Sequence, residues 1–239
     1  MKRNLLFSTM ALVAGSMLAA DSSPKDDVKN AAKKLADKAN YSWKTTVAVP
    51  EDSPFKPGPT EGKTEKGGYT HITMSFGENQ MEGAMKGEKR AFKGQEGWQT
   101  AEEMAAAGGA GGAGGGRGRG GMLRTFQTPA AQAEELVSKV KELQSADGVY
   151  SGDLTEEGAK SLLAFGGRGG GNGPEISGAK GSAKFWVKDG ALTKYEFKVK
   201  GSISFNGNDR EIDRTTTVEI KDVGTTKVEV PDEAKKKLS

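Results

Sequence analysis

The chain has 239 residues, and its 35 Lys and Arg against 32 Asp and Glu give a net charge of +3. This near balance argues against a nucleic-acid-binding protein, which needs a clustered basic face. The chain has no cysteine and one histidine, His71, which excludes disulfides, cysteine-ligated or multi-histidine metal sites and thiol catalysis. A Ser-His-Asp triad would have to use His71, and no motif supplies its partners. The composition favours a binding or carrier protein without a cofactor, and not an enzyme.

The first twenty residues predict a secretory signal peptide. Lys2 and Arg3 form a basic start, residues 5–18 are apolar or small, and Ala20 offers a small residue for cleavage. The apolar stretch is short for a membrane span, and the sequence predicts no transmembrane segment further along. We therefore expect cleavage after Ala20 and a mature protein in the periplasm or outside the cell.

A helix and a strand are predicted next. Ser23 is suited to cap a helix over 23–40, and apolar residues recur there with helical spacing. These residues are Val28, Ala31, Ala32, Leu35 and Ala39. Residues 41–49 alternate with period two, which predicts a strand. The stretch 50–59 holds four of the eight prolines and predicts a stiff loop.

Alternation returns from Tyr69. Ile72, Met74 and Phe76 share one face of a strand, and His71 lies on the opposite, polar face. Short strands around 81–85, 91–92 and 97–98 follow, with turns between them. This stretch predicts a meander of antiparallel strands.

Two low-complexity tracts, 105–121 and 166–173, hold 16 of the 35 glycines. Such segments bury too little surface to offset chain entropy, so we expect flexible loops that are dispensable for folding. The Gly-Arg steps at 116–121 resemble the RGG segments of RNA-binding proteins, but interleaved aromatic residues are absent. We therefore expect no nucleic-acid partner.

Between these two tracts, the sequence predicts two helices, over 129–144 and 155–165, and a short strand at 149–154. In the C-terminal third, 183–187 and 195–205 alternate clearly. A three-residue loop, Lys188 to Gly190, keeps one face of this hairpin apolar and pairs Phe185 with Thr193. The second strand is long enough to require a bend, which we place at Gly201.

These elements predict an α+β fold in one domain over 21–239. The fold class is a curved antiparallel sheet, an open half-barrel, with helices covering its concave face.

The order of elements resembles the LolA family of periplasmic lipoprotein carriers and the mycobacterial lipoproteins LppX and LprG. The resemblance is carried by Tyr41-Ser42-Trp43, by Phe185-Trp186-Val187 with Asp189-Gly190, and by the final segments Asp222-Val223-Gly224 and Val228-Glu229-Val230-Pro231. In that family an unclosed barrel with a helical lid holds acyl chains in an apolar cavity. The resemblance implies a lipophilic ligand or lipoprotein as the partner. The chain departs from LppX and LprG in lacking their lipidated cysteine, and its Gly-Arg tracts have no counterpart in the family's pattern.

A set of uncharged residues is predicted to share the concave face and to line the ligand cavity. The set is Ile72, Met74, Phe76, Phe185, Val187, Tyr195, Phe197, Val199, Ile203 and Phe205. A wall of this kind selects ligands by volume and apolarity, as acyl chains require. Tyr195 would meet a headgroup at the rim, and the helices at 129–144 and 155–165 would form the lid.

The sequence leaves open whether side chains fill this space as an ordinary core. In that case the chain would be a non-catalytic exported interaction or scaffold domain. It would meet an envelope protein partner through its Gly-rich loops or Trp186, which lies on the polar face of its strand.

Overall fold

The computed structural model describes residues 22–53, 56–94, 97–100, 102–103, 126–164, 175–205 and 208–239, and of Phe205 and Asn208 only the backbone. The predicted signal peptide, its cleavage site and the two Gly-rich tracts lie outside the described residues. The helices are α1 Pro24–Ala36, α4 Pro129–Ser138, α5 Glu156–Leu163 and α6 Asp232–Lys237. None of these described helices combines the length and hydropathy that a membrane-spanning helix needs.

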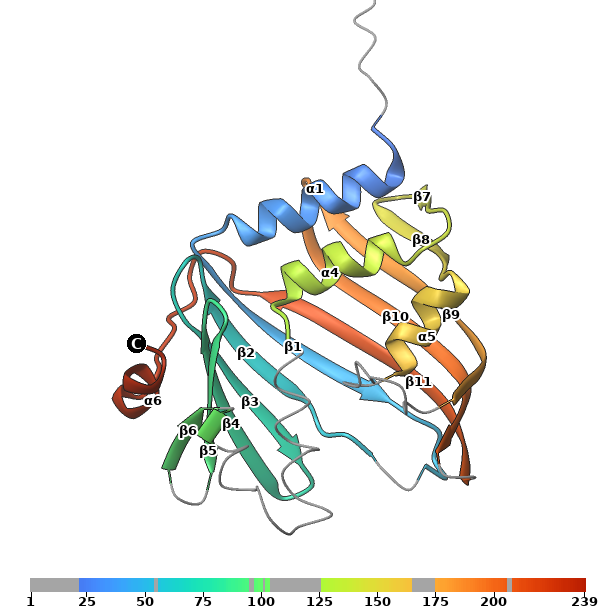
Figure 1. The fold of residues 1–239 in the computed structure, drawn as a ribbon. Helices are drawn as coiled ribbons and strands as arrows, with labels where there is room; N and C mark the ends of the chain where they lie inside the picture. The colour runs from blue at the N-terminus through green and yellow to red at the C-terminus, as the bar shows by residue number, and fades with distance from the viewer. Residues whose placement is uncertain are drawn as a thin grey trace, which may run out of the picture.

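Eleven strands form one antiparallel sheet (Figure 1). The first six are β1 Asn40–Ala48, β2 Thr60–Glu65, β3 Thr70–Phe76, β4 Asn79–Lys86, β5 Lys89–Gly94 and β6 Gly97–Thr100. The other five are β7 Gln144–Ala146, β8 Val149–Asp153, β9 Glu175–Lys188, β10 Ala191–Phe205 and β11 Asn208–Lys221. Their order is β6-β5-β4-β3-β2-β1-β11-β10-β9-β8-β7, so β6 and β7 are the two edges and the sheet is open.

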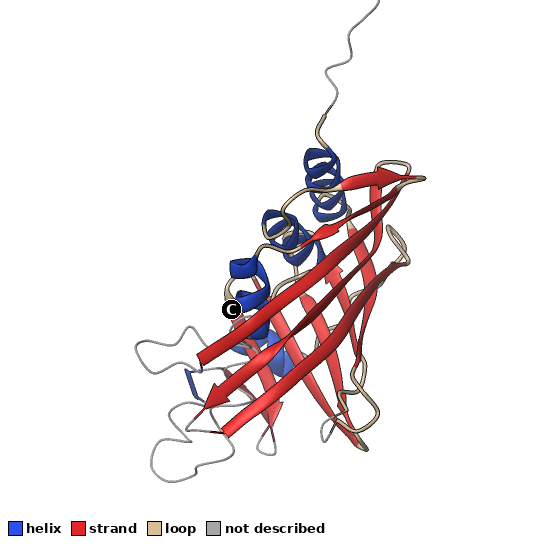
Figure 2. Cartoon of the chain, turned by 90° about the vertical axis from the view of Figure 1, so that its right-hand side faces the viewer, coloured by secondary structure: helices blue, strands red, loops and turns tan. Residues whose placement is uncertain are grey.

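The sheet curves around three helices. Helices α1, α4 and α5 lie on the same face of it (Figures 1 and 2). One continuous hydrophobic cluster joins these helices to Phe92 of β5 and Tyr41 of β1, and also to Phe185 of β9. Because strands from both halves of the sheet reach the same cluster, this face is concave. The predicted fold class, a curved antiparallel sheet with helices over its concave face, is confirmed.

The opposite, convex face is covered at one side by α6, which packs against β5 and β6. A second, smaller cluster forms there from Ala84, Ala91, Trp98, Val230, Ala234 and Leu238. Neighbouring residues of one strand belong to different clusters, as Ala91 and Phe92 do, because successive side chains of a strand point to opposite faces.

Two of the helices begin at a residue whose side chain caps them, and Ser23 is the cap that the sequence predicts. The Ser23 hydroxyl accepts a hydrogen bond from the Asp26 amide at 3.2 Å, and that of Thr155 accepts one from the Gly158 amide at 2.9 Å. Helix α4 is shorter than the predicted 129–144. It ends at Ser138 because Val140 leaves the helix and forms a β-bridge with Leu154.

The register of the β9–β10 hairpin differs from the prediction. Its loop has two residues, Asp189 and Gly190, which both have positive φ (53° and 70°), as a type I′ turn requires. Leu192 therefore pairs with Val187, and a register shift between Leu192 and Lys194 brings Tyr195 opposite Phe185. The three-residue loop is wrong because the shift comes after the turn, not inside it. A second shift lies at Gly201, where the bend was predicted.

Candidate ligand-binding face

The structure brings the predicted cavity residues together. Ile72, Met74, Phe185, Tyr195, Phe197 and Val199 are buried in the cluster beneath the helices. Phe76, Val187 and Ile203 are half-buried and pack against that cluster. Phe205 ends β10, and its side chain lies outside the described part of the chain. Strand alternation therefore placed the set on one face.

Burial on the concave face is uneven along the strands. Helices α1 and α4 cross the upper half of the sheet in Figure 1, and the buried members share one cluster with residues of both helices. Toward the lower end, where the β3–β4 and β10–β11 hairpins turn, the apolar side chains are only half-buried. We call these residues the lower apolar zone, and they are Phe76, Met81, Leu162, Ile176, Ile203 and Ile212. These six residues pack against the core cluster and remain half-buried, as Val187 does at the other end of β9.

Tyr195 does not lie at a rim. It is fully buried, its ring stacks on Phe185 with centroids 6.4 Å apart, and its hydroxyl lies 2.5 Å from the Gln132 side-chain oxygen in α4, to which it donates. Burial raises the pKa of Tyr195 well above its usual value, so the hydroxyl remains a neutral donor. Tyr195 thus fixes α4 to the sheet and does not meet a headgroup.

Two cations of β11, Arg210 and Arg214, lie on the concave face beside the lower apolar zone. Arg214 of β11 pairs with Val199 and follows Ile212 on the same face of its strand. Its side chain is half-buried, and its guanidinium donates to the backbone carbonyl of Leu162 in α5. Loss of hydration lowers the pKa of Arg214 to about 10, so the group stays charged at neutral pH.

The predicted cavity set did not include Arg214 or four members of the zone, which are Met81, Leu162, Ile176 and Ile212. The signal was present, because Ile212, Arg214, Thr216 and Val218 alternate along β11 and share a face. The sequence did not predict an arginine on this apolar face, because charged side chains normally lie on the solvent side of a strand.

The convex face carries polar features of a different kind. His71 lies 3.6 Å from Glu82, on the face opposite to α1, α4 and α5, as the sequence predicted for a histidine on the polar side. Lys194 lies over the ring of Trp186 at 4.5 Å from its centroid, so this aromatic is partly covered. A shallow hollow of about 470 Å³ at the end of β8 is lined by charges of both signs, among them Lys141, Asp153 and Lys200.

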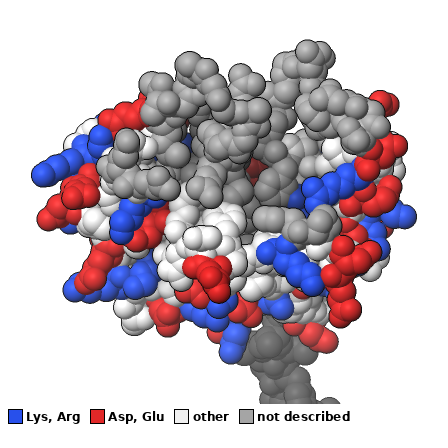
Figure 3. Space-filling view, turned by 90° about the horizontal axis from the view of Figure 1, so that it is seen from below, with Lys and Arg blue, Asp and Glu red and all other residues white. Residues whose placement is uncertain are grey.

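Surface charge is mixed. Seen from below, Lys and Arg alternate with Asp and Glu along both sides of the view, and a group of uncharged residues lies below the centre (Figure 3). Among the described residues, no group of three or more His, Asp or Glu side chains could hold a metal ion.

No protein-family model matches the chain, and no curated protein matches it by sequence. Among solved structures, the lipoprotein LppX of Mycobacterium tuberculosis matches with a TM-score of 0.45 and 8% identity, covering 86% of this chain and 97% of LppX. LprF of Mycobacterium bovis matches with a TM-score of 0.42 and 12% identity, over 88% of this chain and 98% of LprF.

A third solved structure, a DUF1329 family protein of Desulfovibrio piger, has a TM-score of 0.32 and 9% identity, over 84% of this chain and 92% of that one. These likenesses concern the fold. LppX is also one of the lipoproteins that this chain resembles in the order of its predicted helices and strands.

Proposed function

We propose that this chain is an exported protein that binds a lipophilic ligand, the acyl chains of a lipid or lipoprotein, on the concave face of its sheet. The observation that carries the proposal is the lower apolar zone. Six apolar residues from β3, β4, β9, β10, β11 and α5 face the same concavity and remain half-buried. Each methylene group that such a surface removes from water contributes about 0.8 kcal/mol, so acyl chains are a ligand class that gains free energy from contact with it.

Two further features support this function. The sequence resemblance to lipoprotein carriers implies the same ligand class, and the N-terminal residues predict export to the compartment in which such carriers work. The buried half of the concave face would then be the structural core that supports the zone, and α5, which contributes Leu162, would border the ligand.

The second candidate is a scaffold domain with a filled core. It is favoured by the complete burial of Ile72, Phe185, Tyr195 and Val199, which leaves the upper half of the concave face closed by helices. A scaffold of this kind would use its surface to meet an envelope protein partner and would hold no lipid.

Native mass spectrometry of protein purified from a bacterial envelope, followed by solvent extraction, separates the two. We expect the wild type to carry extractable lipid. Ile203→Trp fills the lower apolar zone and should abolish the bound mass, since Ile203 is half-buried there. Ser202→Trp, one residue away on the convex face, is the matched control and should keep it.

Both variants should melt within a few degrees of the wild type. Lipid-free wild type that also takes up neither added phospholipid nor lipopeptide would overturn the carrier function and favour the scaffold.

A further inference from the structure

Lysine and arginine are sorted between the two faces of the sheet. Every lysine on the described strands lies on the convex face, as the strand register places Lys44, Lys184 and Lys198. The arginines of the described strands lie on the concave face. Arg90 pairs with Met85, Arg210 with Ile203 and Arg214 with Val199, and each partner is a member of, or packs against, the core cluster.

The carboxylates of the described strands are sorted as well. Glu61, Glu82 and Asp213 all lie on the convex face, where they pair with lysines at 2.5–2.9 Å. Lysine is therefore used where a hydrated cation meets carboxylates at the surface. Arginine, whose guanidinium is more weakly hydrated and binds carboxylate or phosphate through two parallel hydrogen bonds, is used where apolar side chains surround it.

The three arginines have different surroundings. Arg90 donates to the carbonyls of Glu88 (2.9 Å) and Phe126 (3.2 Å), which makes it a structural tie between β5 and the segment before α4. Arg210 is exposed near the end of β11. Arg214 is half-buried beside Ile212 and Leu162 of the lower apolar zone, and its bond to the Leu162 carbonyl holds the guanidinium in place there.

We propose that the ligand carries an anionic group, a carboxylate or a phosphate, and that Arg214 recognises it while the lower apolar zone holds the acyl chain. This inference rests on the proposed lipid-binding function and specifies its ligand class as anionic lipid. A fixed guanidinium among apolar side chains discriminates between headgroups that share the same acyl chains. A purely apolar face does not make that distinction.

The test is competitive lipid uptake, read by native mass spectrometry of the full-length mature protein. One arm uses vesicles of equimolar phosphatidylglycerol and phosphatidylcholine with identical acyl chains, and the other uses oleic acid against oleyl alcohol. The wild type should favour the anionic member at least tenfold, or about 1.4 kcal/mol. Preference in both arms indicates recognition of any anion, and preference in one arm identifies phosphate or carboxylate.

The variants assign this preference to Arg214. Arg214→Gln should abolish the preference and still take up lipid, and Arg214→Lys should keep part of it. Lys198→Gln removes the same charge from the convex face and should leave the preference unchanged. Melting temperatures check the fold, and the wild-type competition is decisive even if Arg214→Gln is unstable.

The outcomes separate the two levels of the proposal. Lipid uptake without headgroup preference, or a preference that survives in folded Arg214→Gln, would overturn the inference and leave the lipid-binding function intact. No uptake of any of the four lipids would overturn the function itself.

Discussion

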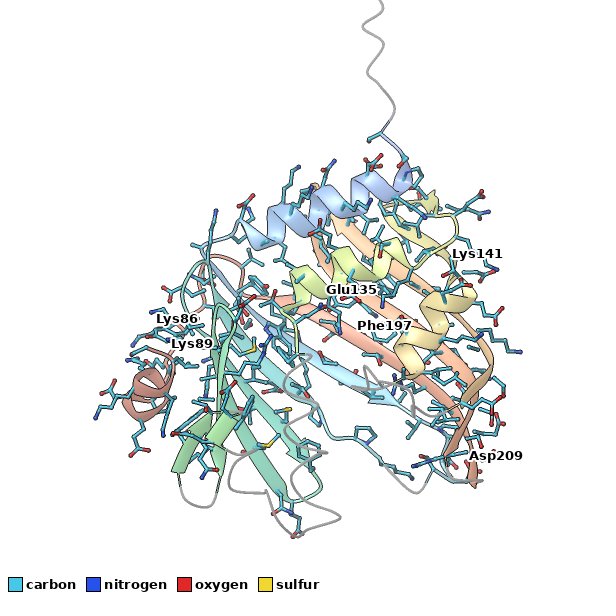
Figure 4. The ribbon with its side chains drawn as sticks, viewed as in Figure 1. Lys86, Lys89, Glu135, Lys141, Phe197 and Asp209 are labelled. Carbon is cyan, nitrogen blue, oxygen red and sulfur yellow. The ribbon has the colours of Figure 1, made fainter. Side chains whose placement is uncertain are left out.

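Phe197 and Lys198 are adjacent on β10 and test the assignment of the two faces most simply. Phe197 is 5% exposed and lies between α4 and α5 (Figure 4), whereas Lys198 is exposed on the convex face. Replacing a buried phenylalanine with alanine removes its transfer free energy and leaves a cavity, so Phe197→Ala should cost about 3–5 kcal/mol. Lys198→Ala should stay within about 0.5 kcal/mol, because Asp213 keeps its 2.5 Å ion pair with Lys200.

Urea denaturation followed by far-UV circular dichroism measures both variants. With an m-value of about 3 kcal/mol/M, Phe197→Ala should lower the midpoint by about 1–1.7 M, and Lys198→Ala should barely move it. The m-value itself should not change. Equal midpoint shifts in the two variants would show that β10 does not present Phe197 to the core, and the register described above would fail.

Two further predictions concern glycine packing and the C-terminal helix. A side chain at Gly62 would overlap the indole of Trp43, so Gly62→Ala should destabilise the protein by about 1–3 kcal/mol. Gly94→Ala is the control and should be mild, because the nearest atom to an added Cβ there is 3.4 Å away. Equal shifts in melting temperature for the two variants would refute this packing. Deleting 232–239 removes α6 from the convex face and uncovers Trp98, which is 5% exposed, so tryptophan emission should shift to the red. An unchanged emission maximum would show that α6 does not protect this side chain.

The sequence predicted the concave face well because it depends on period-two alternation. Residues 195–199 alternate over a long strand, and the structure buries every odd-numbered one. The same reasoning missed β2, whose sequence TEGKTE offers no apolar residue to the core. That strand contributes Gly62 and Thr64 instead, because the Trp43 indole covers Gly62 and donates to the Thr64 hydroxyl at 3.3 Å. A strand that accepts a neighbour's side chain carries no hydrophobic pattern of its own.

The candidate site was only partly predictable for a related reason. Which residues share the concave face follows from alternation. How deeply each is buried depends on where α1, α4 and α5 cross the sheet, and this depends on contacts far apart in the sequence. One such contact is the bond from Lys25 to the Val140 carbonyl at 2.6 Å. The sequence therefore could not separate Tyr195, which belongs to the core, from Ile203, which belongs to the lower apolar zone.

Lipid binding on the concave face is tested most directly by tryptophan quenching. Trp43 faces the concave side, where it stacks on Phe126 with centroids 5.7 Å apart, and Trp186 lies on the convex face under Lys194. Two single-tryptophan proteins, Trp98→Phe with Trp186→Phe and Trp98→Phe with Trp43→Phe, are loaded with brominated phosphatidylglycerol. We predict quenching of Trp43 and unchanged emission from Trp186. Quenching confined to Trp186, or equal quenching of both, would place the lipid outside the concave face and contradict the account.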